Sequence, residues 1–264
     1  MNRIEHKFQE LKRKRKKAFI AFLTSGDPSL AVTRQLVWAL EKVGVDLIEL
    51  GVPFSDPLAD GSTIQDASLR ALRKGVNLKS ILKTVKDIRR LSSIPIALMT
   101  YYNPVYSYGE DRFIVDACKS GVDGLLIPDL PPEESPRLVS LAKKKGLSTI
   151  FFLSPTTSKD RMKKITAAST GFIYYVSLRG VTGERAKLPA DLIAKLKSVK
   201  KLTKKPVCVG FGISTPAQVR SISKVADGVI VGSAIIKEIE KHSRQKDLLE
   251  RVSRFVKPFI NELS

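Results

Sequence analysis

The sequence predicts an α/β protein: a single (β/α)8 barrel of the TIM-barrel class, spanning residues 1–264, with an additional N-terminal helix. Eight short apolar runs alternate with amphipathic stretches, which is typical of a parallel sheet. The 264 residues, 43% of them hydrophobic, suffice for one barrel-sized core. An open doubly wound sheet is the alternative, but the first strand runs into Thr24-Ser-Gly-Asp-Pro28 instead of a GxGxxG fingerprint.

The individual elements follow from the spacing of apolar residues, which run together or alternate in strands and recur every three or four positions in helices. We expect strands at residues 18–23, 46–50, 94–100, 124–127, 148–153, 172–176, 207–210 and 228–231. We expect the intervening helices at residues 30–43, 78–91, 112–120, 136–145, 160–168, 190–202, 216–225 and 235–242. Residues 4–15 and 248–263 are predicted as further helices, and Pro258 is expected to kink or interrupt the second.

The second strand carries a carboxylate among apolar residues. Glu49 lies just before Gly51, where the strand ends, and a loop with Asp56 and Asp60 follows. An ionised carboxylate in an apolar interior costs several kcal/mol or takes a raised pKa unless it is paired. Because the carboxyl ends of barrel strands carry the chemistry, we expect Glu49 to be functional. An ion pair with a Lys or Arg of a neighbouring element is the structural alternative.

Glycine-rich turns follow the last two expected strands. They are Gly210-Phe-Gly-Ile-Ser-Thr-Pro216 and Gly232-Ser-Ala234, each directly before a helix. Glycines let backbone N–H groups approach an anion, and a helix N-terminus adds partial positive charge. We therefore expect a phosphate site here, with ordinary tight turns as the alternative. The long connection after the sixth strand, residues 177–187, is either a loop that folds over a ligand or an ordinary exposed link.

Cysteine and histidine are too sparse for most metal or nucleophilic chemistry. Cys118 and Cys208 lie far apart without CxxC spacing, and the only histidines are His6 and His242, in Lys-rich terminal helices. Neither a metal site nor a disulfide framework is expected. If the chain is an enzyme, its acid and base are expected to be carboxylates.

The formal net charge is +20, and its densest run is Lys12–Lys17. Such charge raises the possibility of nucleic-acid binding, but no RNA- or DNA-binding motif accompanies it, so nucleic acid is not expected as the main partner. No run of roughly 18 apolar residues could span a membrane. Without a secretory signal pattern after the basic N-terminus, a cytoplasmic location is expected.

Six segments together resemble the tryptophan synthase alpha subunit family. They run in order along nearly the whole chain: ELGVPFSDPLADGSTIQ from Glu49, YYNPVYSYG, PDLPPEES from Pro128, YYVSLRGVTG, GFGIS and GSAI. Ser62 departs from the family pattern, which usually has proline after Asp-Gly. We expect this departure to loosen the loop behind Asp60.

The resemblance implies a lyase of tryptophan biosynthesis that cleaves indole-3-glycerol phosphate to indole and glyceraldehyde 3-phosphate by a retro-aldol reaction. That reaction needs a proton at indole C3, stabilised charge at the ring nitrogen and proton removal from the side-chain hydroxyl. It needs no cofactor or metal in this chain. Glu49, with a raised pKa, is the candidate acid/base, and Asp60 would stay ionised and hold the indole N–H.

The resemblance also assigns substrate contacts. Tyr175 would position Glu49 or the substrate, with a plain core role as the alternative. The apolar walls for the indole would be Phe22, Leu126 and Phe211, unless they serve only barrel packing. The phosphate would be held by Gly183, Gly212, Gly232 and Ser233.

The family works with a pyridoxal-phosphate-dependent beta subunit, so an alpha2beta2 heterotetramer is expected, with Asp56, Pro57, the Asn103-Pro104 turn and Asp129 facing the partner. An acidic beta surface is one hypothesis for the high positive charge. The alternatives are a free-standing indole-3-glycerol phosphate lyase, a sugar-phosphate isomerase or epimerase, a noncatalytic binding or scaffold protein, and a nucleic-acid binder. The isomerase or epimerase would share the phosphate turns but gives no reason for the DPLADG loop.

Overall fold

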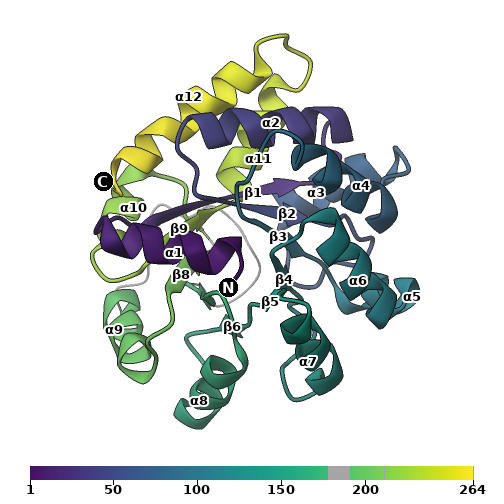
Figure 1. Cartoon of the computed structure of the whole chain (residues 1–264). Helices are drawn as coiled ribbons and strands as arrows, with labels where there is room; N and C mark the ends of the chain where they lie inside the picture. The colour runs from purple at the N-terminus through teal and green to yellow at the C-terminus, as the bar shows by residue number, and fades with distance from the viewer. Residues whose placement is uncertain (178–190, 211, 264) are drawn as a thin grey trace.

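The strands form one parallel sheet that closes into a barrel (Figure 1). The computed structural model describes residues 1–177, 191–210 and 212–263. Within these ranges the strands are β1 (Ala18–Thr24), β2 (Leu47–Gly51), β3 (Ile96–Met99), β4 (Gly124–Leu126), β5 (Ser148–Thr149), β6 (Phe152–Leu153), β7 (Ile173–Val176), β8 (Val207–Gly210) and β9 (Gly228–Val231). Their order is β5-β4-β3-β2-β1-β9-β8-β7-β6.

The two edges of this sheet belong to one stretch of chain. β5 pairs with β4, and β6 pairs with β7, but only residues 150–151 separate β5 from β6. Together they are the single strand expected at residues 148–153, so the fifth barrel strand joins both edges. The predicted (β/α)8 barrel is therefore confirmed, with its fifth strand divided in two.

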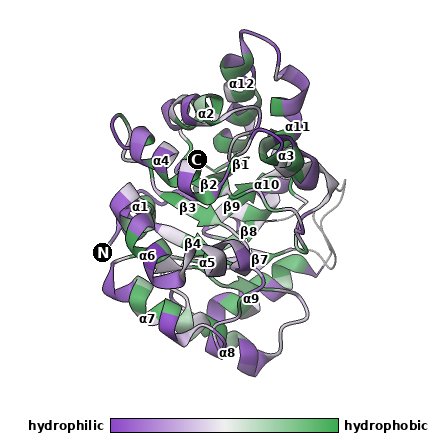
Figure 2. Ribbon diagram, turned by 90° about the vertical axis from the view of Figure 1, so that its right-hand side faces the viewer, coloured by the Kyte–Doolittle hydropathy of each residue, from purple (hydrophilic) through white to green (hydrophobic). Residues whose placement is uncertain are grey.

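Helices surround the barrel with their apolar sides turned inward (Figure 2). They are α1 (Arg3–Arg13), α2 (Leu30–Lys42), α3 (Ser62–Leu72), α4 (Leu78–Ile88), α5 (Tyr102–Tyr108), α6 (Glu110–Ser120), α7 (Pro136–Lys144), α8 (Lys159–Ala168), α9 (Leu192–Leu202), α10 (Pro216–Ser223), α11 (Ser233–His242) and α12 (Leu248–Asn261). In the described part of the chain, none of them combines the length and apolar character that crossing a membrane requires.

Local sequence signals explain where several helices begin. Asn77 and Thr215 form capping boxes at α4 and α10, and Ser29 accepts a hydrogen bond from the N–H of Val32 at the start of α2. Two of the helices were not predicted from the sequence. α3 begins inside the expected glycine- and proline-rich loop, and α5 has only 7 residues, too few to show a helical period.

Pro258 does not interrupt the last helix. α12 continues from Leu248 to Asn261 with the proline inside it. Its apolar side includes Phe259, whose ring lies 6.4 Å from the ring of Phe19 on β1. Because side chains alternate along a strand, Phe19 faces the outer helices, whereas Phe22, three positions later, faces the barrel interior.

The predicted additional N-terminal helix, α1, covers the amino end of the barrel (Figure 1). Ile4 is fully buried, and a Cβ atom on Gly124 of β4 would lie only 2.8 Å from its Cδ1 atom. The ring of Phe8 lies 5.7 Å from that of Phe172. Glycine at position 124 thus makes room for α1 to close this end with apolar side chains.

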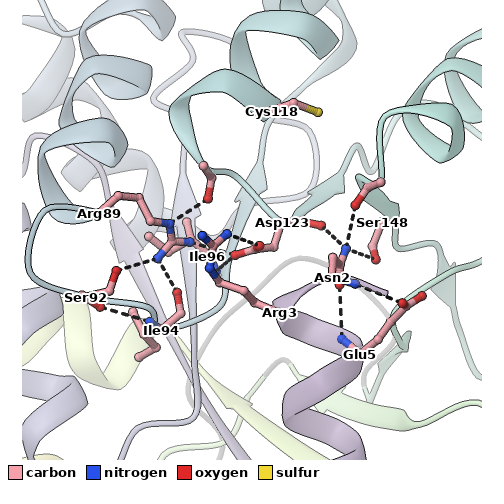
Figure 3. Close-up of polar contacts among 12 residues, drawn as sticks. Asn2, Arg3, Glu5, Arg89, Ser92, Ile94, Ile96, Cys118, Asp123 and Ser148 are labelled. Carbon is pink, nitrogen blue, oxygen red and sulfur yellow. Dashed lines mark hydrogen bonds and ion pairs between the residues drawn. The ribbon is translucent and has the colours of Figure 1, made fainter.

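A buried carboxylate ties α1 to the barrel (Figure 3). The carboxylate of Asp123 accepts hydrogen bonds from the N–H of Ile96 at 2.9 Å, from Arg89 at 2.8 Å and from Arg3 at 3.0 Å. The side-chain amide of Asn2 donates to the carbonyl of Asp123 at 2.8 Å. The side chain of Asp123 is 3% exposed and that of Arg89 is 11% exposed, so these charges satisfy each other away from water.

We expect Asp123→Ala to lower the free energy of unfolding by about 3 kcal/mol, because it leaves the buried guanidinium of Arg89 without its ionic partner. Urea unfolding followed by circular dichroism measures this. Asp160→Ala is the control, since that side chain is 92% exposed and its removal should change stability by less than about 0.5 kcal/mol. Equal stability of the two variants would contradict the assigned role of Asp123.

Candidate active site

A cavity lies at the carboxyl ends of the barrel strands, opposite α1. Six residues singled out from the sequence line it: Phe22, Glu49, Asp60, Gly212, Gly232 and Ser233. The other lining residues, which the sequence analysis did not single out, are Ile64, Met99, Tyr174, Ile213 and Ile230. The cavity therefore combines two carboxylates, an apolar wall and a glycine-rich end.

Glu49 lies near the end of β2, opposite Phe22 of β1 in the strand register. It is 1% exposed, and its Oε2 atom has no hydrogen-bond partner among the described residues. Burial, assisted by the nearby charge of Asp60, raises its pKa to about 8. No Lys or Arg of the described residues forms an ion pair with it, so the structure gives no support to the purely structural alternative.

Asp60 is buried in a more polar setting, just before α3. The hydroxyl of Tyr101 donates a hydrogen bond to its Oδ2 atom at 3.1 Å and accepts one from the N–H of Ala59 at 2.9 Å. Burial raises the pKa of Asp60 to about 6, and the Tyr101 hydrogen bond opposes that rise. At neutral pH Asp60 is therefore mostly ionised while Glu49 is mostly protonated. Two carboxylates at one cavity thus hold opposite protonation states.

Tyr174, rather than Tyr175, faces the cavity. Neighbouring side chains on β7 point to opposite sides, so only one of the two tyrosines can point inward. Tyr175 is fully buried, and burial followed by the charge of Asp191 raises its pKa. Burial followed by the charges of Glu49 and Asp60 raises the pKa of Tyr174. The sequence-based position of Tyr175 at the substrate was therefore one residue off.

Of the other predicted contacts, only Leu126 can be compared with the cavity. Leu126, at the end of β4, is fully buried and is not among the lining residues. Gly183 and Phe211 lie outside the described residues, as does the connection 178–190. Tyr101 is a contact that the sequence analysis missed. Its only signal was its place in the YYNPVYSYG segment after β3.

The glycine-rich end of the cavity meets the start of a helix. Gly232 immediately precedes α11, a helix of 10 residues whose first turn begins at Ser233. The first N–H groups of a helix lack partners within it and favour an anion. Gly212 has a φ of 76°, a left-handed conformation that favours glycine. This end can hold a phosphate group through backbone N–H groups.

The described residues contain no cluster of three or more His, Cys, Asp or Glu side chains able to hold a metal ion. The titratable groups among the described residues that line the cavity are Glu49, Asp60 and Tyr174. What they offer is proton transfer by one carboxylate and stabilisation of positive charge by the other, next to an apolar surface and an anion site.

Comparison with known proteins relates nearly the whole chain to one protein family. The family model for the tryptophan synthase alpha chain matches residues 8–263. The tryptophan synthase alpha chain of Geotalea daltonii is 50% identical over 256 residues, covering 97% of each chain. The crystal structure of tryptophan synthase subunit alpha from Legionella pneumophila strain Paris superimposes with a TM-score of 0.93 at 39% identity, covering 100% of this chain and 98% of that one. A chain of Mycobacterium tuberculosis tryptophan synthase gives 0.91 at 33% identity, covering 99% and 98%.

The burial of Glu49 predicts a pH-dependent stability. The folded protein keeps Glu49 protonated up to about pH 8, whereas the unfolded chain loses that proton near pH 4.5. The unfolded state binds fewer protons in this window, so stability falls as pH rises through it. We expect Glu49→Gln to be more stable than the wild type at pH 8 by about 4 kcal/mol, and by less at pH 5.

Urea unfolding at pH 6.5 and pH 8 isolates this effect, because Asp60, with a pKa of about 6, contributes mainly below that range. The exposed Glu134 provides the control variant Glu134→Gln, which should follow the wild type at both pH values. A gain from Glu49→Gln that does not grow with pH would show that Glu49 is ionised in the folded protein.

Ser62 occupies the first helical position of α3, where the amide has no partner within the helix and proline is favoured. Gly61 has φ −82° and ψ 168°, an extended conformation compatible with a following proline. We expect Ser62→Pro to raise the free energy of unfolding by about 0.5–1 kcal/mol by restricting the unfolded chain. Thermal unfolding measures it, with Ser62→Ala as the control. A lower midpoint for the proline variant would disprove the account.

Proposed function

Because this chain belongs to the tryptophan synthase alpha chain family, we propose that Glu49 and Asp60 carry the family's reaction in the cavity described above. The chain is a lyase of tryptophan biosynthesis, which cleaves indole-3-glycerol phosphate to indole and glyceraldehyde 3-phosphate. The family and reaction expected from the sequence are thus confirmed. The roles of individual residues are our proposal, and the observation that carries it is the pair of buried carboxylates at one cavity, each with an oxygen that has no hydrogen-bond partner among the described residues.

Glu49 transfers the proton in both directions. In its protonated form it donates a proton to indole C3, which makes the bond from C3 to the glycerol chain breakable. As that bond breaks, its electron pair returns to the ring, and the Glu49 carboxylate takes back a proton from the side-chain hydroxyl as the aldehyde forms. The net proton balance on Glu49 is zero. A pKa of about 8 suits a group that must both give and accept a proton near neutral pH.

Asp60 stabilises the intermediate charge. Protonation at C3 leaves the indole nitrogen cationic, and an ionised carboxylate that accepts the N–H hydrogen bond lowers the energy of that state. The Oδ1 atom of Asp60 is buried and has no partner among the described residues, whereas Oδ2 is held by Tyr101 at 3.1 Å. We assign the N–H contact to Oδ1, with Tyr101 fixing the orientation of the carboxylate.

The rest of the cavity separates the two ends of the substrate. Phe22, Ile64, Met99 and Tyr174 provide a surface for the flat apolar indole. Gly212, Gly232 and Ser233 hold the phosphate at the start of α11. This arrangement places the scissile bond between the apolar surface and the phosphate site, beside Glu49.

The family implies a beta-subunit partner, and we propose where it docks. The segments after β2 and β3 present two strongly exposed apolar side chains, Leu58 at 81% and Tyr106 of α5 at 69%. Asp56 lies close to Leu58 in sequence, and Asn103 and Pro104 lie in the first turn of α5. Asp129 accepts hydrogen bonds from the N–H of Tyr102 and so supports the start of this helix. Exposed apolar groups at such an edge favour burial by a partner.

An alpha2beta2 heterotetramer, pyridoxal phosphate confined to the beta subunit, no cofactor in this chain and a cytoplasmic location belong to the same proposal. In this assembly the beta subunit receives indole from the alpha subunit. If it also orders the loops of this edge, the alpha subunit turns over faster in the complex than alone.

Indole release from indole-3-glycerol phosphate tests the assignment. We expect Glu49→Gln to lower the rate by at least about a thousandfold, because the group proposed to transfer the proton is lost, and Asp60→Asn by about a hundredfold, because charge stabilisation is lost. Asp46→Asn is the control. Asp46 is a partly buried carboxylate at the opposite end of β2, where it accepts a hydrogen bond from the N–H of Phe19 at 2.9 Å.

Each protein is assayed alone and with a beta subunit. Slow release that rises with the partner supports the alpha-subunit role, whereas fast release by the isolated chain identifies a free-standing lyase. Glu49→Gln with wild-type activity in either setting would refute the acid/base role of Glu49.

A further inference from the structure

A basic groove lies at the end of the barrel opposite the catalytic cavity. Six cationic side chains line it: Lys12, Arg15, Lys16, Lys17, Lys200 and Lys204. Lys17 directly precedes β1 and Lys204 lies just before β8. Because all strands are parallel, these residues lie at the amino ends of the strands, where α1 covers the barrel. The groove is therefore distinct from the cavity that holds Glu49.

The positive charge of the basic groove is largely uncompensated. Asp227 is the one carboxylate among the described lining residues. It accepts hydrogen bonds from Lys200 and from the N–H of Val207, and it lies 3.9 Å from the ammonium of Lys17. Within the described residues, Lys12, Arg15, Lys16 and Lys204 form no ion pair. By contrast, Lys14 next to them pairs with Glu10 at 2.6 Å. Like charges that line one groove repel one another, so their gathering lowers stability unless an anion binds among them.

Arg15 has a backbone conformation that is unfavourable for a residue other than glycine. Its φ is 57°, and among the described residues it is the one non-glycine residue with positive φ. Lys16 N–H donates to the carbonyl of Leu11 at 2.9 Å and Arg15 N–H to that of Lys12 at 3.2 Å, which is the Schellman ending that favours glycine at this position. The chain instead places a guanidinium there, at the wall of the groove, and backbone strain of this kind concentrates at functional sites.

The shape and lining of the basic groove favour a compact ligand. Its volume is about 350 Å³, within the range of small-molecule sites. Its one aromatic residue, Phe8, is 7% exposed and packs against Phe172, so the lining offers no ring on which nucleic-acid bases could stack. An arginine fork and several lysine ammonium groups are the donors that bind phosphate oxygens.

We propose that the basic groove binds a compact polyphosphate anion, a chain of two or more adjacent phosphate groups. Such a chain matches the several cations that converge on one small volume, which a single phosphate would leave largely uncompensated. The chain can belong to an inorganic polyphosphate or to a nucleotide. This site is separate from the phosphate site at Gly232, and its occupancy does not depend on the proposed roles of Glu49 and Asp60.

Isothermal titration calorimetry of the full chain with inorganic tripolyphosphate, at an ionic strength near 0.15 M, tests the proposal. The groove variant is Lys12→Gln/Lys16→Gln/Lys204→Gln. The matched control, Lys79→Gln/Lys83→Gln/Lys86→Gln, removes three exposed positive charges from one side of α4. We expect the groove variant to bind about tenfold more weakly or worse, and the control to stay within about twofold of the wild type. Both should release indole at the wild-type rate.

Arg15→Gly provides an independent check that does not depend on folding of the triple variant. It should weaken tripolyphosphate binding while raising the unfolding midpoint, because glycine relieves the backbone conformation. ATP that binds as tightly as tripolyphosphate would identify the phosphate chain alone as the ligand, and tighter ATP binding would identify a nucleotide. No binding by the wild type, equal losses in both triple variants, or binding of single-stranded RNA without binding of tripolyphosphate would overturn the proposal.

Discussion

Closure of the sheet is the constraint on which the rest of this structure depends. The stretch from β5 to β6 pairs with β4 on one side and β7 on the other, so the barrel closes around an apolar interior. A carboxylate that points into such an interior is desolvated from every side. The raised pKa of Glu49 follows mainly from its buried position on β2, and the nearby charge of Asp60 adds to the rise.

The two ends of the barrel use polar groups in opposite ways. At the amino end, every charge of the Asp123 cluster has a partner, and the result is a rigid attachment of α1. At the carboxyl end, Glu49 Oε2 and Asp60 Oδ1 are buried without partners among the described residues. Satisfied buried groups stabilise a fold, whereas unsatisfied ones mark the place where a ligand completes the hydrogen bonding.

The catalytic arrangement therefore reduces stability in the free protein. Glu49 is useful because the apolar interior holds it protonated near neutral pH, and the same interior makes its ionisation unfavourable. The pKa of Asp60 rises less, because Tyr101 stabilises the ionised carboxylate with one hydrogen bond. A difference of environment across one cavity thus separates the acid from the charge-stabilising base without any metal ligand set among the described residues.

The sequence by itself determined the barrel, the additional N-terminal helix and the cavity position of Glu49, Asp60, Gly212 and Gly232, because apolar periodicity, glycine turns and a misplaced carboxylate are local signals. It did not determine which tyrosine of β7 faces the cavity. The residues on both faces of this strand are apolar, so the sequence pattern does not distinguish the inner face from the outer one.

Tyr101 contacts Asp60, which is 41 residues away in the sequence, and Lys12 and Lys204 line the same basic groove. Contacts between distant segments like these arise only when the sheet closes and brings those segments together, and no local pattern specifies which distant residues then meet. Tertiary structure alone decided them, because chain folding sets the distance between such residues.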